Sequence, residues 1–117
     1  MDIRVLITDD DPLVRVALAH FINRDPEVVV VGEAENGEEA LAAIEELAPE
    51  DRPDVVMMDV LMPTMDGIEA TEQIRGRWPE IRTLAVSTLD SRETVIPMLR
   101  VGASGYVLKE ADAEEIV

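Results

Sequence analysis

The sequence predicts an α/β domain with a five-stranded parallel sheet in a three-layer sandwich, and three observations lead to this expectation. Short apolar runs rich in β-branched residues alternate along the chain with helical patterns of about ten to fifteen residues. The runs are apolar enough to be buried on both faces, as the strands of a parallel sheet are. The chain has 117 residues, 47% of them hydrophobic and 31% charged, which suits a single domain with one core.

The strands are expected at residues 3–8, 28–34, 54–59, 82–87 and 105–109. Helices should fill the intervals between them, and several have recognisable first residues. Asp11 before Pro12 is typical of an N-cap followed by proline at the first helical position. The spacing of a capping box occurs three times, at Asn36 with Glu39, Asp66 with Glu69, and Asp112 with Glu115.

The later helices carry signals at both ends. Trp78 before Pro79 should end the third helix against the core, and Ser91 can cap the fourth. Pro97 lies inside the fourth helix and should kink or shorten it. The fifth helix, expected from residue 112, is little longer than one turn at residue 117, so we expect a domain cut from something longer.

The composition excludes several classes of function. The absence of cysteine removes disulfides, thiol nucleophiles and thiolate metal sites. With 26 acidic and 10 basic residues the formal net charge is −16, so nucleic acid should not bind to this chain. No apolar run is long enough to cross a membrane, and the first residues do not form a charged-then-apolar leader, so we expect a cytoplasmic protein.

Polar residues gather where the predicted strands end. Ligands of an open parallel sheet bind beyond the carboxyl ends of its strands. The residues expected there are Asp9 and Asp10, Asp59, Ser87 and Thr88, and Lys109, the only lysine. Carboxylates placed close together repel unless a cation neutralises them, and oxygen ligands without histidine or cysteine favour Mg²⁺. A metal, a carboxylate and an ammonium group together indicate phosphoryl transfer to or from an aspartate.

Five segments, taken in order along the chain, resemble a response-regulator receiver domain of two-component signalling. They are 5–13 (VLITDDDPL), 35–41 (ENGEEAL), 53–59 (PDVVMMD), 62–67 (MPTMDG) and 102–109 (GASGYVLK). The details DDxPLVR and GASGY are similar to the NarL/LuxR-type subgroup, whose receivers precede a LuxR-type helix-turn-helix. The resemblance implies a flavodoxin-like sheet with the strand order 2-1-3-4-5.

The resemblance also implies the roles of the acidic residues. Asp59 would be the phosphoacceptor. Asp10 and Asp59 would bind Mg²⁺ directly, together with the backbone carbonyl of Leu61, and Asp9 would act mainly through a water molecule.

The same resemblance assigns three further residues. Lys109 would pair with the phosphoryl group, and Ser87 would move towards it. Tyr106 would change rotamer as Ser87 moves, which would bias a surface formed by the fourth helix, the fifth strand and the fifth helix. The resemblance implies a sensor histidine kinase as partner, homodimerisation on phosphorylation, and DNA binding through a missing C-terminal domain. The chain would not be a classical enzyme, because it would catalyse only its own phosphorylation and dephosphorylation.

Two other classes of function, and one variant of the receiver, stay open. A Mg²⁺-dependent phosphohydrolase is compatible with Asp9 and Asp11, which resemble a haloacid-dehalogenase-like start, but the threonine expected after that pair is missing. A receiver fold used only as a binding module is disfavoured by the intact set of acidic, hydroxyl and lysine residues. A stand-alone receiver of the chemotaxis type is a variant of the main hypothesis.

Overall fold

Strands and helices alternate along the chain, as the sequence predicted. The computed structural model describes residues 2–60, 62–87 and 92–108, although not the side chains of 87, 92–95 and 106–108. The strands are β1 (Ile3–Thr8), β2 (Val28–Ala34), β3 (Val55–Asp59), β4 (Arg82–Ser87) and β5 (Gly105–Leu108). The helices are α1 (Pro12–Ile22), α2 (Gly37–Glu46), the short 3₁₀ helix η1 (Pro49–Asp51), α3 (Gly67–Arg77) and α4 (Arg92–Arg100).

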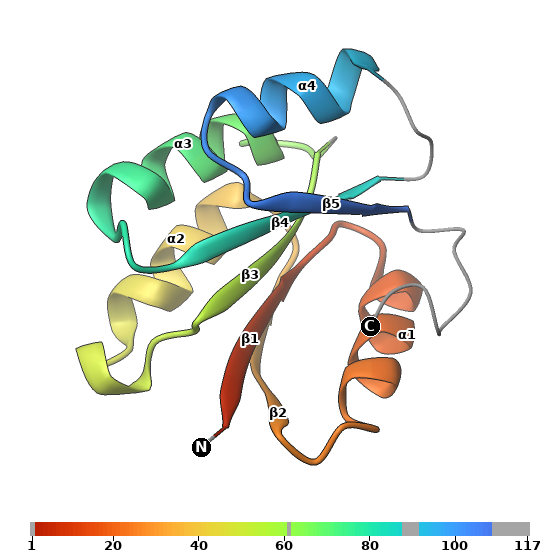
Figure 1. Cartoon of the computed structure of the whole chain (residues 1–117), viewed down its shortest axis with the longest axis vertical. Helices are drawn as coiled ribbons and strands as arrows, with labels where there is room; N and C mark the ends of the chain where they lie inside the picture. Colours follow the sequence, from red (N-terminus) through yellow and green to blue (C-terminus); the bar gives the residue numbers. More distant parts are fainter. Residues whose placement is uncertain (1, 61, 88–91, 109–117) are drawn as a thin grey trace.

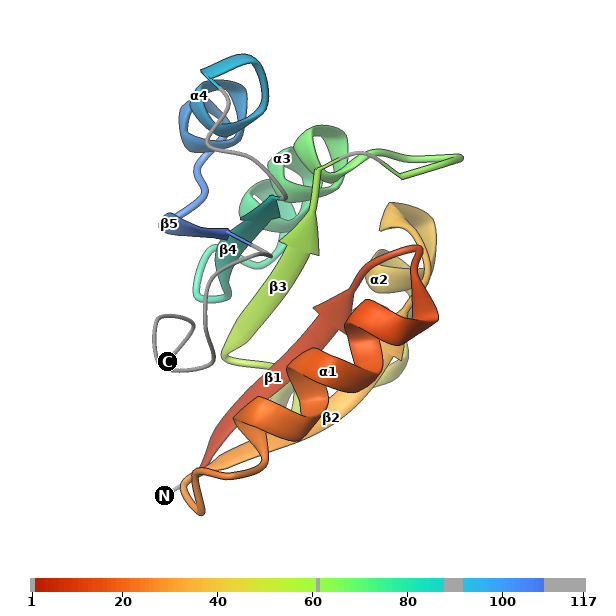
Figure 2. The ribbon, with the colours of Figure 1, turned by 90° about the vertical axis from the view of Figure 1, so that its right-hand side faces the viewer.

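The strands form one parallel sheet with the order β2-β1-β3-β4-β5. α1 lies on one face of this sheet, and α2, α3 and α4 lie on the other (Figure 1 and Figure 2). The α/β class and the parallel sheet expected from the sequence are therefore confirmed. The predicted fifth helix, with its capping pair, and Ser91 lie outside the described residues.

The capping residues in the sequence correctly predicted where α1, α2 and α3 begin. The side chains of Asp11, Asn36 and Asp66 each accept a backbone N–H in the first turn of α1, α2 and α3, respectively, so these predicted N-caps are confirmed. One detail differs from the capping box. The Glu39 carboxylate accepts from the N–H of Glu35 at 3.1 Å, one residue before the cap.

One strand boundary differs from the expectation, whereas Pro97 lies inside the fourth helix as predicted. The third strand begins at Val55, one residue later than expected, and the carboxylate of Asp54 accepts the N–H of Arg4 at 2.8 Å. α4 continues beyond Pro97 to Arg100, and its predicted kink or shortening stays a prediction. Proline lacks an N–H and its ring crowds the carbonyl four residues earlier, but its own carbonyl can still accept, and it does so from the N–H of Val101 at 3.2 Å.

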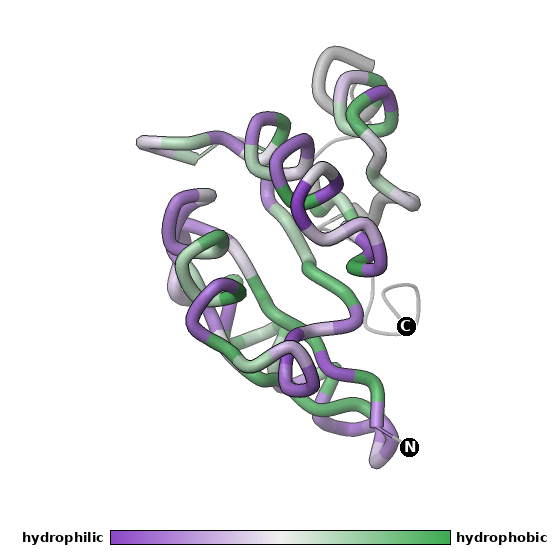
Figure 3. Tube along the Cα trace, turned by 90° about the vertical axis from the view of Figure 1, so that its left-hand side faces the viewer, coloured by the Kyte–Doolittle hydropathy of each residue, from purple (hydrophilic) through white to green (hydrophobic). Residues whose placement is uncertain are grey.

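Two groups of apolar side chains hold the layers together. The larger group joins the sheet to α2, α3 and α4, with Ile44, Ile74 and Met98 completely buried. The smaller group joins Val5 and Ile7 to α1. In Figure 3 the strands are mainly green, whereas the outer turns of α2 and α3 carry purple, hydrophilic segments. This division explains why the strands read as continuous apolar runs and the helices as amphipathic.

Replacing Ile74 by alanine should test the larger group. We expect a loss of about 2–5 kcal/mol in the free energy of unfolding, because the side chain is completely buried and its removal leaves a cavity. Urea denaturation followed by circular dichroism measures the change. Leu13→Ala is the control, because Leu13 is 77% exposed and its truncation should cost less than about 0.5 kcal/mol. Equal losses in both variants would contradict this description of the core.

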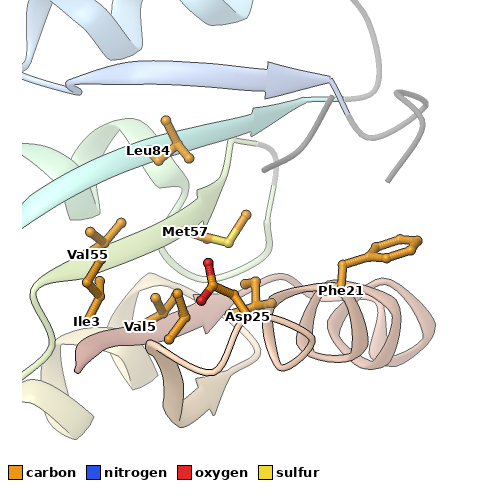
Figure 4. A pocket seen from close by; sticks show the side chains of 9 residues that line it. Ile3, Val5, Phe21, Asp25, Val55, Met57 and Leu84 are labelled. Carbon is orange, nitrogen blue, oxygen red and sulfur yellow. The ribbon is translucent and has the colours of Figure 1, made fainter. Parts of the chain in front are cut away.

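The face of the sheet that carries α1 is only partly covered by the described residues. An apolar groove of about 330 Å³ runs along it (Figure 4). Its walls include Val55 and Met57 of β3, Leu84 of β4 and Phe21 of α1, and Asp25 lies at the same groove. In the part of the chain that the structure describes, no helix is both long enough and apolar enough to traverse a bilayer.

Candidate functional site

The pairing of β1 with β3 brings two of the predicted acids together. Thr8 lies opposite Met58 in the parallel register, so Asp9 and Asp59 are the next residues at the same edge of the sheet. Both side chains are buried: Asp9 is 0% exposed and Asp59 is 6% exposed. Two carboxylates are thus held at the carboxyl edge of the sheet, where ligands of this architecture bind.

Asp10 completes a group of three carboxylates. A carboxylate oxygen from each of Asp9, Asp10 and Asp59 lies within 4.8 Å of the others, and Asp10 is the exposed member. Two like charges at such a separation repel by about 3–4 kcal/mol at an effective dielectric constant of about 20. A cation held between them would offset that repulsion, and an all-oxygen ligand set suits Mg²⁺. The residues present therefore fit the metal site predicted from the sequence.

Backbone hydrogen bonds orient the two buried carboxylates. Oδ1 of Asp9 accepts the N–H of Asp11 at 2.9 Å, which folds the start of α1 back over the end of β1. Oδ1 of Asp59 accepts the N–H of Val60 at 2.9 Å. Each bond fixes one oxygen of its carboxylate, so the direction in which the second oxygen points is fixed as well.

Two glycines allow the surrounding loops to approach the site closely. A Cβ atom on Gly67 would overlap with the backbone carbonyl of Asp59, and the N–H of Gly67 bonds the carbonyl of Val60 at 2.8 Å. Gly37 donates its N–H to the carbonyl of Met65 at 3.0 Å, which ties the start of α2 to the loop after β3. The phosphoacceptor candidate Asp59 is thus packed directly against the first residue of α3.

The remaining predicted residues fall partly outside the described chain. Leu61, Thr88 and Lys109 lie outside the described residues. Ser87 is the last residue of β4 and Tyr106 lies in β5, but their side chains are not among those described. Their predicted roles therefore stay predictions.

The structure adds a functional candidate, Arg15, to which the sequence analysis assigned no role although it is the last residue of the segment DDxPLVR. Arg15 of α1 donates from Nη1 to the backbone carbonyl of Asp9 at 2.6 Å. The signal in the sequence was the position of Arg15, one helical turn after Asp11, which directs its side chain back towards the start of α1. That spacing alone does not reveal which carbonyl the guanidinium reaches.

Comparison with known proteins agrees with this geometry. The family model described as "Response regulator receiver domain" matches residues 5–117. The chain belongs to the response regulator receiver family. The acidic group at the ends of β1 and β3 is the one typical of the magnesium site of such receiver domains.

The receiver domain is similar to parts of longer transcription regulators. It is 37% identical over 115 residues to the transcriptional regulatory protein DegU of Brevibacillus brevis, covering 98% of this chain and 47% of DegU. It is 40% identical over 115 residues to the transcriptional regulatory protein YxjL of Bacillus subtilis (strain 168), covering 98% of this chain and 51% of YxjL. The chain therefore spans about half the length of these curated relatives.

A solved structure shares both the fold and the subgroup. The receiver domain matches a two-component response regulator of the LuxR family from Aurantimonas sp. SI85-9A1 with a TM-score of 0.88 and 34% sequence identity. The match covers 99% of this chain and 80% of that one. The resemblance to receivers of the NarL/LuxR type, stated from the sequence, is confirmed.

Proposed function

We propose that this receiver domain is a phosphorylation-activated switch in which Asp59 accepts a phosphoryl group from the phosphohistidine of a sensor histidine kinase. The observation that carries the proposal is the convergence of Asp9, Asp10 and Asp59 within 4.8 Å at the carboxyl edge of the sheet. The family of the chain supports the same chemistry. No substrate pocket is needed for this function, because the phosphoryl donor is itself a protein side chain.

Asp59 is the nucleophile of the proposed step. One of its carboxylate oxygens attacks phosphorus while the bond between phosphorus and the imidazole nitrogen of the kinase breaks. The imidazole leaves with the electron pair of that bond and takes up a proton, and Asp59 becomes an acyl phosphate. Positioning and charge neutralisation account for most of the rate, since little other covalent chemistry is required.

The residues around Asp59 would hold a cation and the phosphoryl group. Asp10, Asp59 and the carbonyl of Leu61 would bind Mg²⁺ directly, and Asp9 would bind it through water. Mg²⁺, when bound, would neutralise the carboxylates and stabilise the charge on the phosphoryl oxygens. The ammonium group of Lys109 would pair with one of those oxygens.

The proposed output is a change of surface. The new phosphoryl group adds up to about two negative charges. The hydroxyl group of Ser87 would move towards the phosphoryl group, and Tyr106 would change rotamer as Ser87 moves. The surface of α4, β5 and the proposed fifth helix would then favour homodimerisation. In the full-length protein this would control DNA binding by a C-terminal domain and thereby transcription. The half-length match to DegU and YxjL supports such a domain. We place this activity in the cytoplasm, as the sequence suggested.

Intact-mass measurement tests the acceptor directly. Wild-type protein incubated with Mg²⁺ and a small acyl phosphate should gain one phosphoryl adduct. Asp59→Ala should gain none, because it lacks the attacking carboxylate. Asp51→Ala is the matched control, because Asp51 is an exposed acid of η1, away from the three carboxylates. This variant should gain the same phosphoryl adduct as the wild type. An adduct on Asp59→Ala, or none on folded wild type, would contradict the proposal. Turnover of generic phosphate esters would instead favour a phosphohydrolase.

A further inference from the structure

Arg15 connects three segments that border the acidic site. Its side chain is only 13% exposed, although it is charged. Nη1 donates to the carbonyl of Asp9 at 2.6 Å, and Nε donates to Oε1 of Glu33 at 3.2 Å. Nη2 lies 3.9 Å from Oε1 of Glu35. The guanidinium of α1 thus links the end of β1 to the end of β2 and the residue that follows it.

The bond to Asp9 has a direct geometric consequence. The carbonyl of Asp9 belongs to the peptide group that joins Asp9 to Asp10, and a peptide group is planar from one Cα to the next. Fixing the oxygen of that group therefore restricts the orientation of both flanking Cα atoms. The guanidinium is a rigid planar donor, and its other two nitrogens lie close to the carboxylates of Glu33 and Glu35. The directions of the Asp9 and Asp10 side chains both depend on this peptide.

The positive charge of Arg15 should lower the affinity for Mg²⁺, whereas its orienting effect on the peptide should raise that affinity. A positive charge close to a cation site by itself disfavours the binding of a divalent cation. If Arg15 acted only through its charge, its neutralisation would tighten Mg²⁺ binding. If it acts by orienting the peptide, its loss would weaken Mg²⁺ binding. The two effects differ in sign, so one measurement separates them.

We propose that Arg15 is a positioning residue that orients the Asp9–Asp10 peptide so that both carboxylates converge with Asp59 on the cation. This inference rests on the proposed function, because it concerns the same metal site. Arg15 would act through this peptide and not by contact with the cation or the phosphoryl group. Residues that orient metal ligands in this way contribute roughly tenfold or more to metal affinity.

Isothermal titration of the protein with Mg²⁺, without any phosphodonor, tests the proposal. Arg15→Met should weaken Mg²⁺ binding about tenfold. Arg15→Lys keeps the charge and one donor, so it should weaken binding in the same direction but less. Arg24→Gln is the control: Arg24 is an exposed arginine in the turn after α1, and its loss should leave affinity unchanged or slightly tighter.

The outcomes distinguish the proposal from its alternatives. Unchanged or tighter binding in Arg15→Met would overturn it. If Arg15→Met does not fold, Arg15→Lys decides, because a purely electrostatic role predicts wild-type affinity for a variant of equal charge. Weaker binding in Arg15→Lys than in wild type would then support positioning, and equal binding would overturn it. Wild-type protein that binds no Mg²⁺ would refute the proposed metal site itself, which is a different result.

Discussion

Gly67→Ala should destabilise the domain and suppress phosphorylation, whereas the same substitution at Gly76 should stabilise it. A methyl group on Gly67 would overlap with the carbonyl of Asp59 and lie against the side chain of Met58. Either the start of α3 or the end of β3 must then move. Overpacking of this kind costs about 1–3 kcal/mol, and the displaced Asp59 should also accept phosphate less readily.

Gly76 provides a matched control in the same helix. Nothing lies within 4 Å of a Cβ atom added there, and Gly76 is exposed in the last turn of α3. Alanine has the higher helix propensity, so Gly76→Ala should gain about 0.5–1 kcal/mol. Urea denaturation followed by circular dichroism measures the change in the free energy of unfolding of each variant. The intact-mass measurement gives the extent of phosphorylation of each variant. Shifts of the same sign in the two variants would contradict the close contact between Gly67 and Asp59.

Asp10→Asn should abolish the stabilisation of the fold by Mg²⁺. A ligand that binds only the folded state stabilises it by about 1.4 kcal/mol for each tenfold rise in concentration above its dissociation constant. Wild-type protein should therefore show a denaturation midpoint that rises with Mg²⁺. The variant lacks one of three converging carboxylates, so its midpoint should stay flat over the same range. Because Asp10→Asn also relieves the repulsion among the three carboxylates, the stability of the variant without Mg²⁺ should be higher than that of the wild type.

Asp66→Asn is the charge-matched control for this experiment. It also removes one negative charge near the carboxyl edge, but asparagine caps a helix as well as aspartate does. Its midpoint should follow Mg²⁺ as the wild type does. A rise of the same size in Asp10→Asn would mean that Mg²⁺ acts elsewhere on this acidic surface. Phosphorylation by an acyl phosphate should be lost together with the Mg²⁺ effect in Asp10→Asn.

The fold could be predicted from the sequence because apolar runs and capping residues define most strands and helices locally. The apolar strand at Val28–Ala34 and the N-cap at Asp11 were found at their observed positions. The start of β3 was missed by one residue, because local sequence patterns define the ends of a strand only to within one or two residues. Pro97 was correctly placed inside α4, but the burial of Met98 next to it in the core depends on tertiary packing and could not be predicted from the missing N–H.

Of the candidate site, only the residues at the ends of the strands could be predicted from the sequence. The convergence of Asp9, Asp10 and Asp59 followed from the rule that ligands bind at the carboxyl edge of a parallel sheet. The supporting contacts did not follow from it. Gly67 directly follows the predicted cap Asp66, but its contact with the Asp59 carbonyl depends on how α3 crosses the sheet. Long-range contacts of this kind come from tertiary packing and leave no periodic signal.

Trp78 makes the domain well suited to optical experiments. It is the only tryptophan, it is 6% exposed, and the guanidinium groups of Arg77 and Arg52 lie 4.3 and 5.6 Å from its ring centre. It follows α3, so the eleven residues of that helix, about 16 Å long, separate it from Gly67 and the acidic site. Its fluorescence should therefore change when the domain unfolds and the arginines leave the ring, but not when a cation or a phosphoryl group binds. The fluorescence of Trp78 can thus report the folded fraction while ligand is added, because a ligand bound at the acidic site should not quench it.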